Sequence, residues 1–392
     1  MSHTVYDFAI VGAGAAGLQL AVAMSEDPYF DDASIAIIEK DEKNQNDRTW
    51  CFWEKGNGKW DIIVTKTWQK AQFANSKKLL NLDLKDYQYK MVGALDFYNH
   101  TKSLLSKAKN FTWINDEVDR IEEGEPSTIY GLENSYLSKL VFDSRVDKKF
   151  YEAKDKYIRL LQHFKGWVIE TEKSVFDPNS FMMMDFRLKW PESTSFTYIL
   201  PFSEKKALVE FTFFSPELID DSGYDKYLHK YLKEVLGVEN FKITDQEKGV
   251  IPMSNYPFHQ ANTKNVIKIG TAGSWVKPSS GYSFKNAERY SNKLIENLKA
   301  NKSPDHELFN TRFRKYDSLF LDVLWKNNHL GERIFSNMYS KNDPSMILRF
   351  LDEETNFWQE IKIMSSFQKL PFTKALLRSF SRSHPRDNNI QG

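Results

Sequence analysis

A glycine-rich turn between an apolar strand and a helix constrains this chain of 392 residues more than any other feature. Asp7–Val11 has the pattern of a buried strand, and Gly12-Ala13-Gly14-Ala15-Ala16-Gly17 follows it at once. Leu18–Ser25 has the small and apolar residues of a closely packed helix. Ser34–Glu39 is a second apolar segment that ends in an acid. This order predicts a βαβ unit with parallel strands.

Each glycine has its own role in such a unit. Gly12 allows the tight turn, Gly14 lets the backbone approach a pyrophosphate, and Gly17 lets helix and strand pack closely. The helix N-terminus offers N–H groups and a partial positive charge to the anion. Glu39 stands where a carboxylate accepts hydrogen bonds from the adenosine ribose. The unit predicts a dinucleotide site that includes Gly12, Gly14, Ala15, Ala16, Gly17, Glu39 and Lys40.

A second glycine-containing loop, Gly270–Tyr282, favours FAD over NAD, between which the first motif does not choose. The loop follows an apolar strand and precedes a helical pattern, as in many flavoproteins. Its amides would face the ribityl chain and the flavin carbonyls; the alternative is a plain connecting loop. Arg48 is a candidate contact for pyrophosphate or flavin, or else a surface arginine. The candidates within the late loop are Gly270, Thr271, Pro278, Gly281 and Tyr282.

The pattern of the elements changes along the chain. We expect a loop over Asp41–Asp61, then a helix over Tyr98–Ala108 and strands over Thr112–Arg120 and Lys139–Asp143. Antiparallel alternation follows, then a helix over Tyr224–Leu236, a buried strand over Val266–Gly270 and mainly helices from Asn286. The alternating segments are Trp167–Glu172, Phe181–Arg187, Ser195–Leu200 and Ala207–Phe214.

These elements predict a mixed α/β fold: a Rossmann-like FAD domain of the glutathione-reductase or hydroxylase type, with an inserted antiparallel β layer and a helical C-terminal region. We expect a discontinuous FAD domain over residues 1–150 and 245–300. The β-rich substrate domain would take 151–244, and the helical region 301–392.

Charge and cysteine content exclude several classes of protein. The formal net charge of +1 gives no reason to expect a nucleic-acid partner. Cys51 is the single cysteine, so a disulfide framework is excluded and a cytoplasmic location fits. The histidines show no metal-ligand spacing, and no uncharged run is long enough to span a bilayer.

Four segments resemble the lycopene β-cyclase family, the bacterial carotenoid cyclases in particular. They are Asp47–Trp53 after the first FAD unit, Met184–Arg187 as a central Met-Asp motif, Leu208–Thr212 as an acidic strand, and Gly270–Phe284 as the late flavin loop. With the N-terminal unit, the resemblance covers most of residues 5–290. Two positions depart from the patterns: Phe211 replaces the second Glu of the plant motif, and Thr271 replaces the Asp of hydroxylase-type flavoproteins.

The resemblance implies an isomerase that closes the ψ end groups of lycopene into β-ionone rings, through γ-carotene to β-carotene. Because an alkene is a very weak base, the acid must be a protonated carboxyl, and an apolar pocket raises its pKa. Glu210 is the candidate, since in a strand it shares a face with Leu208 and Thr212. From alternation alone, a solvent-facing Glu210 is equally consistent with the pattern.

Asp185 is the second catalytic candidate. Alternation places it on one face with Phe181 and Met183. It would accept the departing proton, keep Glu210 protonated through like-charge coupling, or hydrogen bond to the flavin. The alternative is a structural ion pair with Arg187.

The resemblance also implies reduced FAD, whose negative charge would stabilise the carbocation, with NAD(P)H as the electron source. Lycopene is a membrane-dissolved polyene, so we expect peripheral contact with a membrane. Gln368–Arg382 mixes Lys and Arg with Phe and Leu, which predicts a helix that lies on an anionic membrane or packs on the domain. Two other functions stay open: a flavin monooxygenase or prenyl or carotenoid reductase, and a carotenoid carrier.

Overall fold

The computed structural model describes residues 4–153 and 156–382, and within them the strands form three sheets. The first sheet has the order β8-β2-β1-β11-β10-β9, with β17 beside β11. Strands β1, β2, β8, β11 and β17 run parallel, and β10 runs antiparallel to both of its neighbours, β11 and β9. The bounds are β1 (Val5–Val11), β2 (Ile35–Glu39), β8 (Phe111–Asn115), β9 (Val118–Glu122), β10 (Ser127–Gly131), β11 (Ser135–Asp143) and β17 (Val266–Lys268).

Helices α1 (Ala15–Ser25) and α5 (Phe284–Lys299) pack together beside this sheet, although they are far apart in the sequence. The Gln19 side-chain amide donates to the Phe284 carbonyl at 3.2 Å, which joins the start of α5 to the middle of α1. Helix α2 (Ala94–Leu105) also contacts α1. The five residues of β2 are all buried, as expected for a parallel strand covered on both faces.

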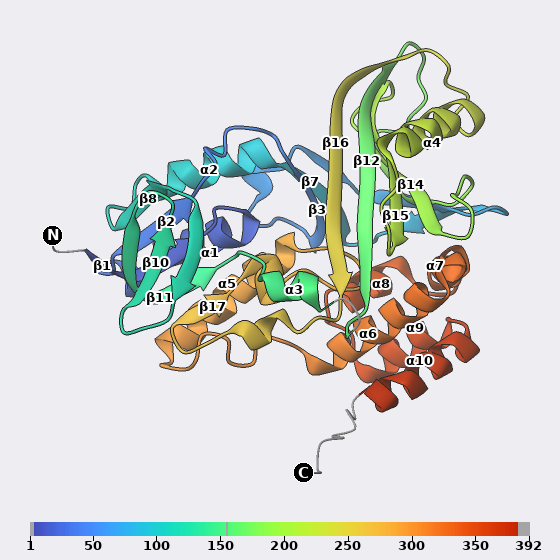
Figure 1. The fold of residues 1–392 in the computed structure, drawn as a ribbon. Helices are drawn as coiled ribbons and strands as arrows, with labels where there is room; N and C mark the ends of the chain where they lie inside the picture. Colours follow the sequence, from blue (N-terminus) through green and yellow to red (C-terminus); the bar gives the residue numbers. More distant parts are fainter. Residues whose placement is uncertain (1–3, 154–155, 383–392) are drawn as a thin grey trace.

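The second sheet has the order β16-β12-β15-β14-β13-β5-β6. Its long strands β12 and β16 stand side by side at the centre of the molecule in Figure 1. Strands β5 and β6 belong to this sheet although they come from the first 150 residues. The sheet therefore crosses the predicted limit between the FAD domain and the substrate domain. The division into these domains remains a proposal. The bounds are β5 (Lys70–Ala74), β6 (Leu79–Asp83), β12 (Arg159–Thr171), β13 (Ser180–Asp185), β14 (Thr194–Pro201), β15 (Lys206–Ser215) and β16 (Phe241–Ser254).

Both faces of the second sheet are covered. Helix α4 (Asp221–Glu234) packs on one face with a cluster that includes Val209, Phe211 and Phe213. The other face contributes Leu208 and Phe214 to a cluster with the C-terminal helices. Those helices, at the lower right of Figure 1, are α6 (Thr311–Lys326), α7 (Gly331–Lys341), α8 (Pro344–Leu351), α9 (Phe357–Ser365) and α10 (Lys369–Arg382); a short α3 (Lys148–Glu152) precedes β12.

A third, small sheet corrects one prediction. The segment Asp41–Asp61, expected to be a loop, contains β3 (Thr49–Lys55). Strand β3 pairs with β7 (Tyr87–Gly93), which also pairs with β4 (Lys66–Trp68). The partner of β3 is far away in sequence, so the local polarity of the segment could not reveal it.

The mixed α/β fold with a Rossmann-like sheet is confirmed. The expected helix over Tyr98–Ala108 begins and ends earlier, as α2. The expected strand over Thr112–Arg120 is wrong, because β8 and β9 are separate strands that flank the buried Asp116. The Asp116 carboxylate accepts backbone hydrogen bonds from Leu132 and Asn134, which fixes the bend between the two strands.

Candidate functional site

The turn after β1 has the geometry that its glycines predicted. Gly12 has φ +99°, a left-handed value that favours glycine. A Cβ on Gly17 would lie 2.0 Å from the Gly12 carbonyl oxygen, so only glycine allows this contact between helix and turn. Gly14 caps α1 without any side-chain hydrogen bond, and a Cβ there would meet open space. The first N–H groups of α1 are therefore free to receive an anion.

Glu39, at the end of β2, holds this turn in place. Its Oε2 accepts a hydrogen bond from the Ala13 N–H at 2.6 Å, and its Oε1 accepts one from the Asp41 N–H at 3.0 Å. Lys43 Nζ lies 3.6 Å from Oε1. Lys43 also lines the cavity that is described below. It was not among the predicted residues, because no motif position marks it.

The late loop lies against the start of α1. Gly270 has φ +60°, and a Cβ there would lie 3.1 Å from the Ala16 Cβ. Gly281 has φ +74°, and a Cβ there would lie 2.4 Å from Gln162 Oε1 on β12. Two glycines thus bring the late loop close to α1 and to the second sheet.

A buried lysine anchors the same loop to the C-terminal helices. Lys277 Nζ lies 3.2 Å from Asp317 Oδ2 on α6 and 3.2 Å from Glu353 Oε1 after α8. The Ser279 hydroxyl donates to Asp317 Oδ1 at 2.6 Å. Both acids come from segments remote in sequence, so no local pattern in the loop indicated this network.

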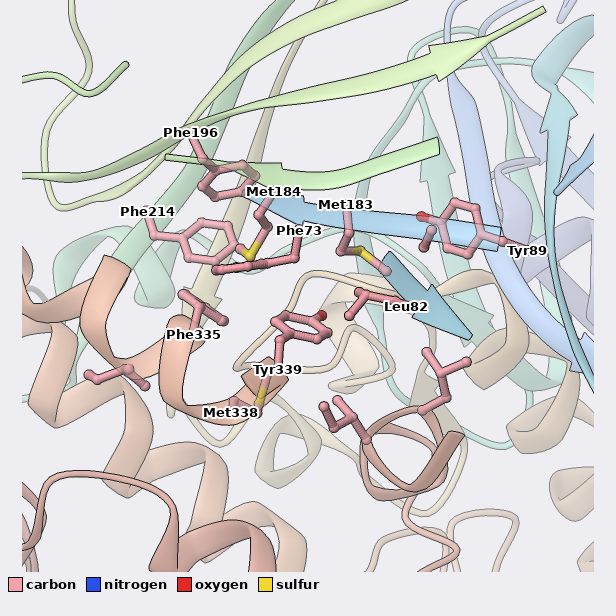
Figure 2. Close-up of a cluster of buried hydrophobic side chains, with 14 of the residues drawn as sticks. Phe73, Leu82, Tyr89, Met183, Met184, Phe196, Phe214, Phe335, Met338 and Tyr339 are labelled. Carbon is pink, nitrogen blue, oxygen red and sulfur yellow. The ribbon is translucent and has the colours of Figure 1, made fainter. Parts of the chain in front are cut away.

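One cavity of about 1050 Å³ extends from the two glycine loops to the second sheet and the C-terminal helices. Its far end is apolar. Figure 2 shows Met183, Met184, Phe196 and Phe214 from the sheet facing side chains of α7. Such a chamber fits a hydrocarbon chain better than a polar ligand. The residues along it from α7, α9, α10 and the link between α9 and α10 are Phe335, Met338, Tyr339, Met364, Phe367, Phe372 and Leu376.

Most of the predicted site residues line this cavity. Three do not: Lys40 is exposed and pairs with Glu117 at 3.2 Å, and neither Pro278 nor Asp185 is part of the lining. Arg48 lines the cavity with a largely exposed side chain. The predicted residues along the cavity are Gly12, Gly14, Ala15, Ala16, Gly17, Glu39, Arg48, Glu210, Gly270, Thr271, Gly281 and Tyr282.

Glu210 faces a second carboxyl group in the cavity wall. Gly166 on β12 is opposite Glu210 of β15 on one side and opposite Glu247 of β16 on the other. A Cβ on Gly166 would lie 3.4 Å from the Glu210 Cβ and 3.4 Å from the Glu247 Cγ. The two carboxyl groups hydrogen bond to each other across this glycine. Thr212 donates to Glu210 at 2.5 Å, and Thr49 donates to Glu247 at 2.9 Å.

Burial determines the protonation of this pair. It raises the pKa of Glu210 well above its usual range, and the charge on Glu247 raises it further, while the Thr212 hydrogen bond opposes the shift. Burial also raises the pKa of Glu247, against hydrogen bonds from Thr49 and Glu210 that lower it. No basic side chain within the described residues forms an ion pair with Glu210. Burial and the neighbouring carboxyl group therefore both favour the protonated form of Glu210.

Asp185 lies on the opposite side of the second sheet. In the pairing of β13 with β5, Met182 is opposite Gln72 and Met184 is opposite Phe73, which leaves Met183 as the extra residue of a bulge. Met183 and Met184 consequently both face the cavity, as Figure 2 shows. The expected face of Asp185 is therefore wrong, because the bulge reverses the alternation.

The Asp185 carboxylate is fully buried under α4. Arg187 Nε donates to it at 3.0 Å, and the Tyr231 hydroxyl of α4 also donates to it. These contacts match the structural ion pair that the sequence left as the alternative. The predicted catalytic role of Asp185 has no support from its position.

Three phenols connect the late loop with the carboxyl pair. The Tyr89 hydroxyl lies 2.9 Å from the Tyr282 hydroxyl and 2.8 Å from that of Tyr198. Tyr198 is opposite Glu210 in the pairing of β14 with β15. All three tyrosines line the cavity, as Glu210 does.

The fold matches solved structures of flavoprotein-type enzymes at low sequence identity. A geranylgeranyl bacteriochlorophyll reductase-like protein from Thermoplasma acidophilum has 11% identity over 96% of this chain and 99% of that chain, with a TM-score of 0.58. A flavin-dependent brominase has 13% identity over 97% and 100%, with a TM-score of 0.57. A probable FAD-dependent monooxygenase from Pseudomonas aeruginosa has 11% identity over 89% and 100%, with a TM-score of 0.54. These likenesses define the fold class.

The family follows from the sequence match. The family model for lycopene cyclase protein matches residues 7–377, nearly the whole chain. The chain belongs to the lycopene cyclase family. A search of curated proteins finds no match for the chain.

Proposed function

We propose that this protein is an FAD-dependent lycopene β-cyclase that forms β-carotene from lycopene through γ-carotene. The observation that carries this proposal is the position of Glu210, a buried carboxyl with a raised pKa in the wall of a largely apolar cavity that both glycine loops also line. Family membership supports a carotenoid substrate.

The residues around the cavity fit FAD. The free N–H groups of α1 would hold the pyrophosphate, Glu39 the adenosine ribose, and Gly270, Thr271 and Gly281 the flavin side. Gly14 at the N-terminus of α1 leaves open space where a Cβ would lie, so the backbone there can approach a diphosphate. Arg48 would contact the diphosphate or the flavin.

The chain's own residues supply the acid chemistry. The carboxyl of Glu210 donates its proton to the terminal alkene of the ψ end group, and the neighbouring alkene then closes on the tertiary cation. Loss of a second proton gives the ring alkene, so the product is an isomer of the substrate. Apolar side chains exclude water that would otherwise capture the cation. A reduced flavin, with NAD(P)H as the electron source, would supply a fixed negative charge beside the cation.

Helices α9 and α10 offer a membrane contact next to the cavity. Both line its apolar end, through Met364 and Phe372 among others, and both also expose apolar side chains. We find no helix within the described residues that could span a bilayer. The contact that we propose is a peripheral one. The exposed apolar residues are Phe357, Trp358, Ile361, Leu370, Leu376 and Leu377, with Lys362, Lys369 and Lys374 exposed among them.

Helix α10 also packs on the domain, which was the alternative for this segment. Ala375 is buried, and Arg378 pairs with Asp322 of α6. The side chains of residues 380–382 lie outside the described part of the chain. We propose that the inner face of α10 anchors it and that its outer face meets the lipid.

Membrane contact predicts a loss of liposome binding in the double variant Trp358→Ser/Leu377→Ser, because both side chains are exposed, at 76% and 64%. Co-sedimentation with anionic liposomes should fall about tenfold or more, because burial of one such side chain in an apolar environment contributes about 1.5–3 kcal/mol to binding. The matched control is Leu132→Ser, at a residue that is 69% exposed in the turn between β10 and β11. Equal binding by the double variant and the control would contradict the contact.

The proposed reaction is tested by expression in a lycopene-accumulating bacterium, with pigment analysis by mass. A cyclase gives a product of the same mass as lycopene; a monooxygenase adds oxygen mass, and a reductase adds hydrogen mass. Glu210→Gln is the internal control and should leave lycopene unconverted. Persistent lycopene with soluble, flavin-loaded wild-type protein would contradict the proposal.

A further inference from the structure

We propose that Glu247 is the proton partner of Glu210: the two carboxyl groups share one proton across Gly166 and act together as the acid and the base of the ring closure. This inference rests on the proposed function. It adds a residue that lies outside every motif of the sequence, since Glu247 is flanked by Gln246 and Lys248 in a polar run.

The register of three strands brings the carboxyl groups together. Glu210 and Glu247 are both opposite Gly166, the one position in this row that has no side chain to separate them. A Cβ on Gly166 would lie 2.9 Å from Leu208 Cδ1 as well as near both glutamates. The glycine therefore allows a contact between residues two strands apart, which a side chain would block.

Two threonine hydroxyls orient the pair. Thr212 donates to Oε1 of Glu210, and Thr49 of the small sheet donates to Oε2 of Glu247. Each carboxyl thus has one oxygen occupied by a hydroxyl and a second oxygen for its partner. Each hydroxyl favours the charged form of the carboxyl that it contacts, and Glu210 is the more buried of the two, so the shared proton stays on Glu210.

The surroundings keep this pair at one proton. Two carboxylates in contact in a poorly solvated wall repel each other, which favours the state of the pair that keeps one proton. Burial raises the pKa of Cys51 to about 12 and also raises the pKa of Tyr282, so these neighbours stay uncharged. Asp245 is a further acid that acts on the pair, and its charge raises the pKa of Glu247.

The proton balance closes within the pair. The terminal alkene uses its π electrons to form a C–H bond with the Glu210 proton, and the next alkene forms the ring C–C bond with the resulting cation. The C–H bond next to the new cationic centre then breaks: its electrons form the ring double bond, and its proton passes to the Glu247 carboxylate. The pair ends with one proton, as it began, and no oxidant or reductant is consumed.

The test combines turnover with a direct measurement of protonation on the flavin-loaded protein. Glu247→Gln should lower turnover at neutral pH by about 10²-fold, in the range of acid–base partners. It should also move the high-pH loss of activity to lower pH, because the neighbouring negative charge is gone. The infrared carbonyl band of the protonated carboxyl, assigned by its loss in Glu210→Gln, should titrate at lower pH in Glu247→Gln. The matched control is Glu239→Gln, an exposed acid that pairs with Lys233.

A second variant gives a shift of opposite sign. Thr49→Val removes the hydroxyl that stabilises the Glu247 anion, so the pair should hold its proton to higher pH. An unmoved infrared titration in both variants, or a wild-type pH profile in Glu247→Gln, would overturn the pairing. Shifted infrared titrations in a protein that does not convert lycopene would support the pairing and contradict only the proposed function.

Discussion

The two faces of the second sheet each bury a carboxyl group, in opposite ways. On the cavity face, Glu210 is 7% exposed and has a second acid as its neighbour. On the α4 face, Asp185 is 0% exposed and is bound by Arg187 and Tyr231. Glu210 avoids a buried charge by keeping a proton. The charge of Asp185 is instead compensated by an arginine and a hydrogen bond.

The difference separates reactivity from stability. A carboxyl that keeps its proton can give it to a weak base, whereas a carboxylate held by an arginine has no proton to give. We therefore expect substitutions on the cavity face to remove activity, and substitutions on the α4 face to lower stability.

The largest expected effect is on turnover in Glu210→Gln. Removing the acid should lower the rate about 10²–10⁴-fold, as for other general acids, while FAD content stays unchanged. The amide has nearly the same size, so the cavity should keep its shape. Conversion of lycopene at the wild-type rate by this variant would eliminate Glu210 as the acid.

Lys277→Met should give the largest loss of stability. It leaves Asp317 and Glu353 charged and close together without their cation, and breaking such a buried network costs about 3–5 kcal/mol. Chemical denaturation gives the free energy of unfolding, and bound flavin should fall because the late loop loses its anchor. Lys264→Met, at an exposed ion pair with Glu125, is the control. Equal unfolding free energies for the two variants would show that the network does not anchor the loop.

Asp185→Ala should lower stability less, by about 1–3 kcal/mol, because the buried Tyr231 hydroxyl loses its acceptor. Turnover per flavin-loaded molecule should stay close to wild type. Glu170→Ala removes an exposed ion pair with Lys206 on the same sheet and should change little. A selective loss of turnover in Asp185→Ala, with stability intact, would restore a catalytic role for Asp185.

The pH dependence of stability should also differ between wild type and Glu210→Gln. The raised pKa of Glu210 means that the folded chain keeps a proton that the unfolded chain releases above the ordinary carboxyl range. Wild type should therefore lose stability relative to Glu210→Gln as pH rises from that range toward the folded pKa, by up to about 1.4 kcal/mol per pH unit. Below that range the difference should be constant. Thermal unfolding of both proteins from acidic to neutral pH measures this difference in stability. A difference that stays constant with pH would mean that Glu210 is ionised in the folded chain.

The sequence predicts local features of this molecule better than distant ones. The turn at Gly12–Gly17 follows from the spacing of its glycines and is found as expected, whereas alternation left open which way Glu210 faces and the family resemblance favoured the cavity. Asp185 was placed on the wrong face because one inserted residue reverses the alternation, and a bulge has no signature in a single sequence.

Other parts of the site depend on contacts between remote segments. Glu247 reaches Glu210 only through the register of three strands, and Lys277 finds its partners on two C-terminal segments. Strand β3 likewise forms because β7 is its partner. Charge and periodicity within a window do not encode such pairings.

The most direct test of acid-catalysed ring closure is to run the reaction in deuterium oxide with flavin-loaded protein equilibrated beforehand in the same solvent. If the carboxyl pair supplies the first proton, each new ring retains one deuterium from the solvent, and the product gains one mass unit per ring. Glu210→Gln should form almost no labelled product. A cyclic product without deuterium, or one with the added mass of oxygen or of two hydrogens, would contradict the account.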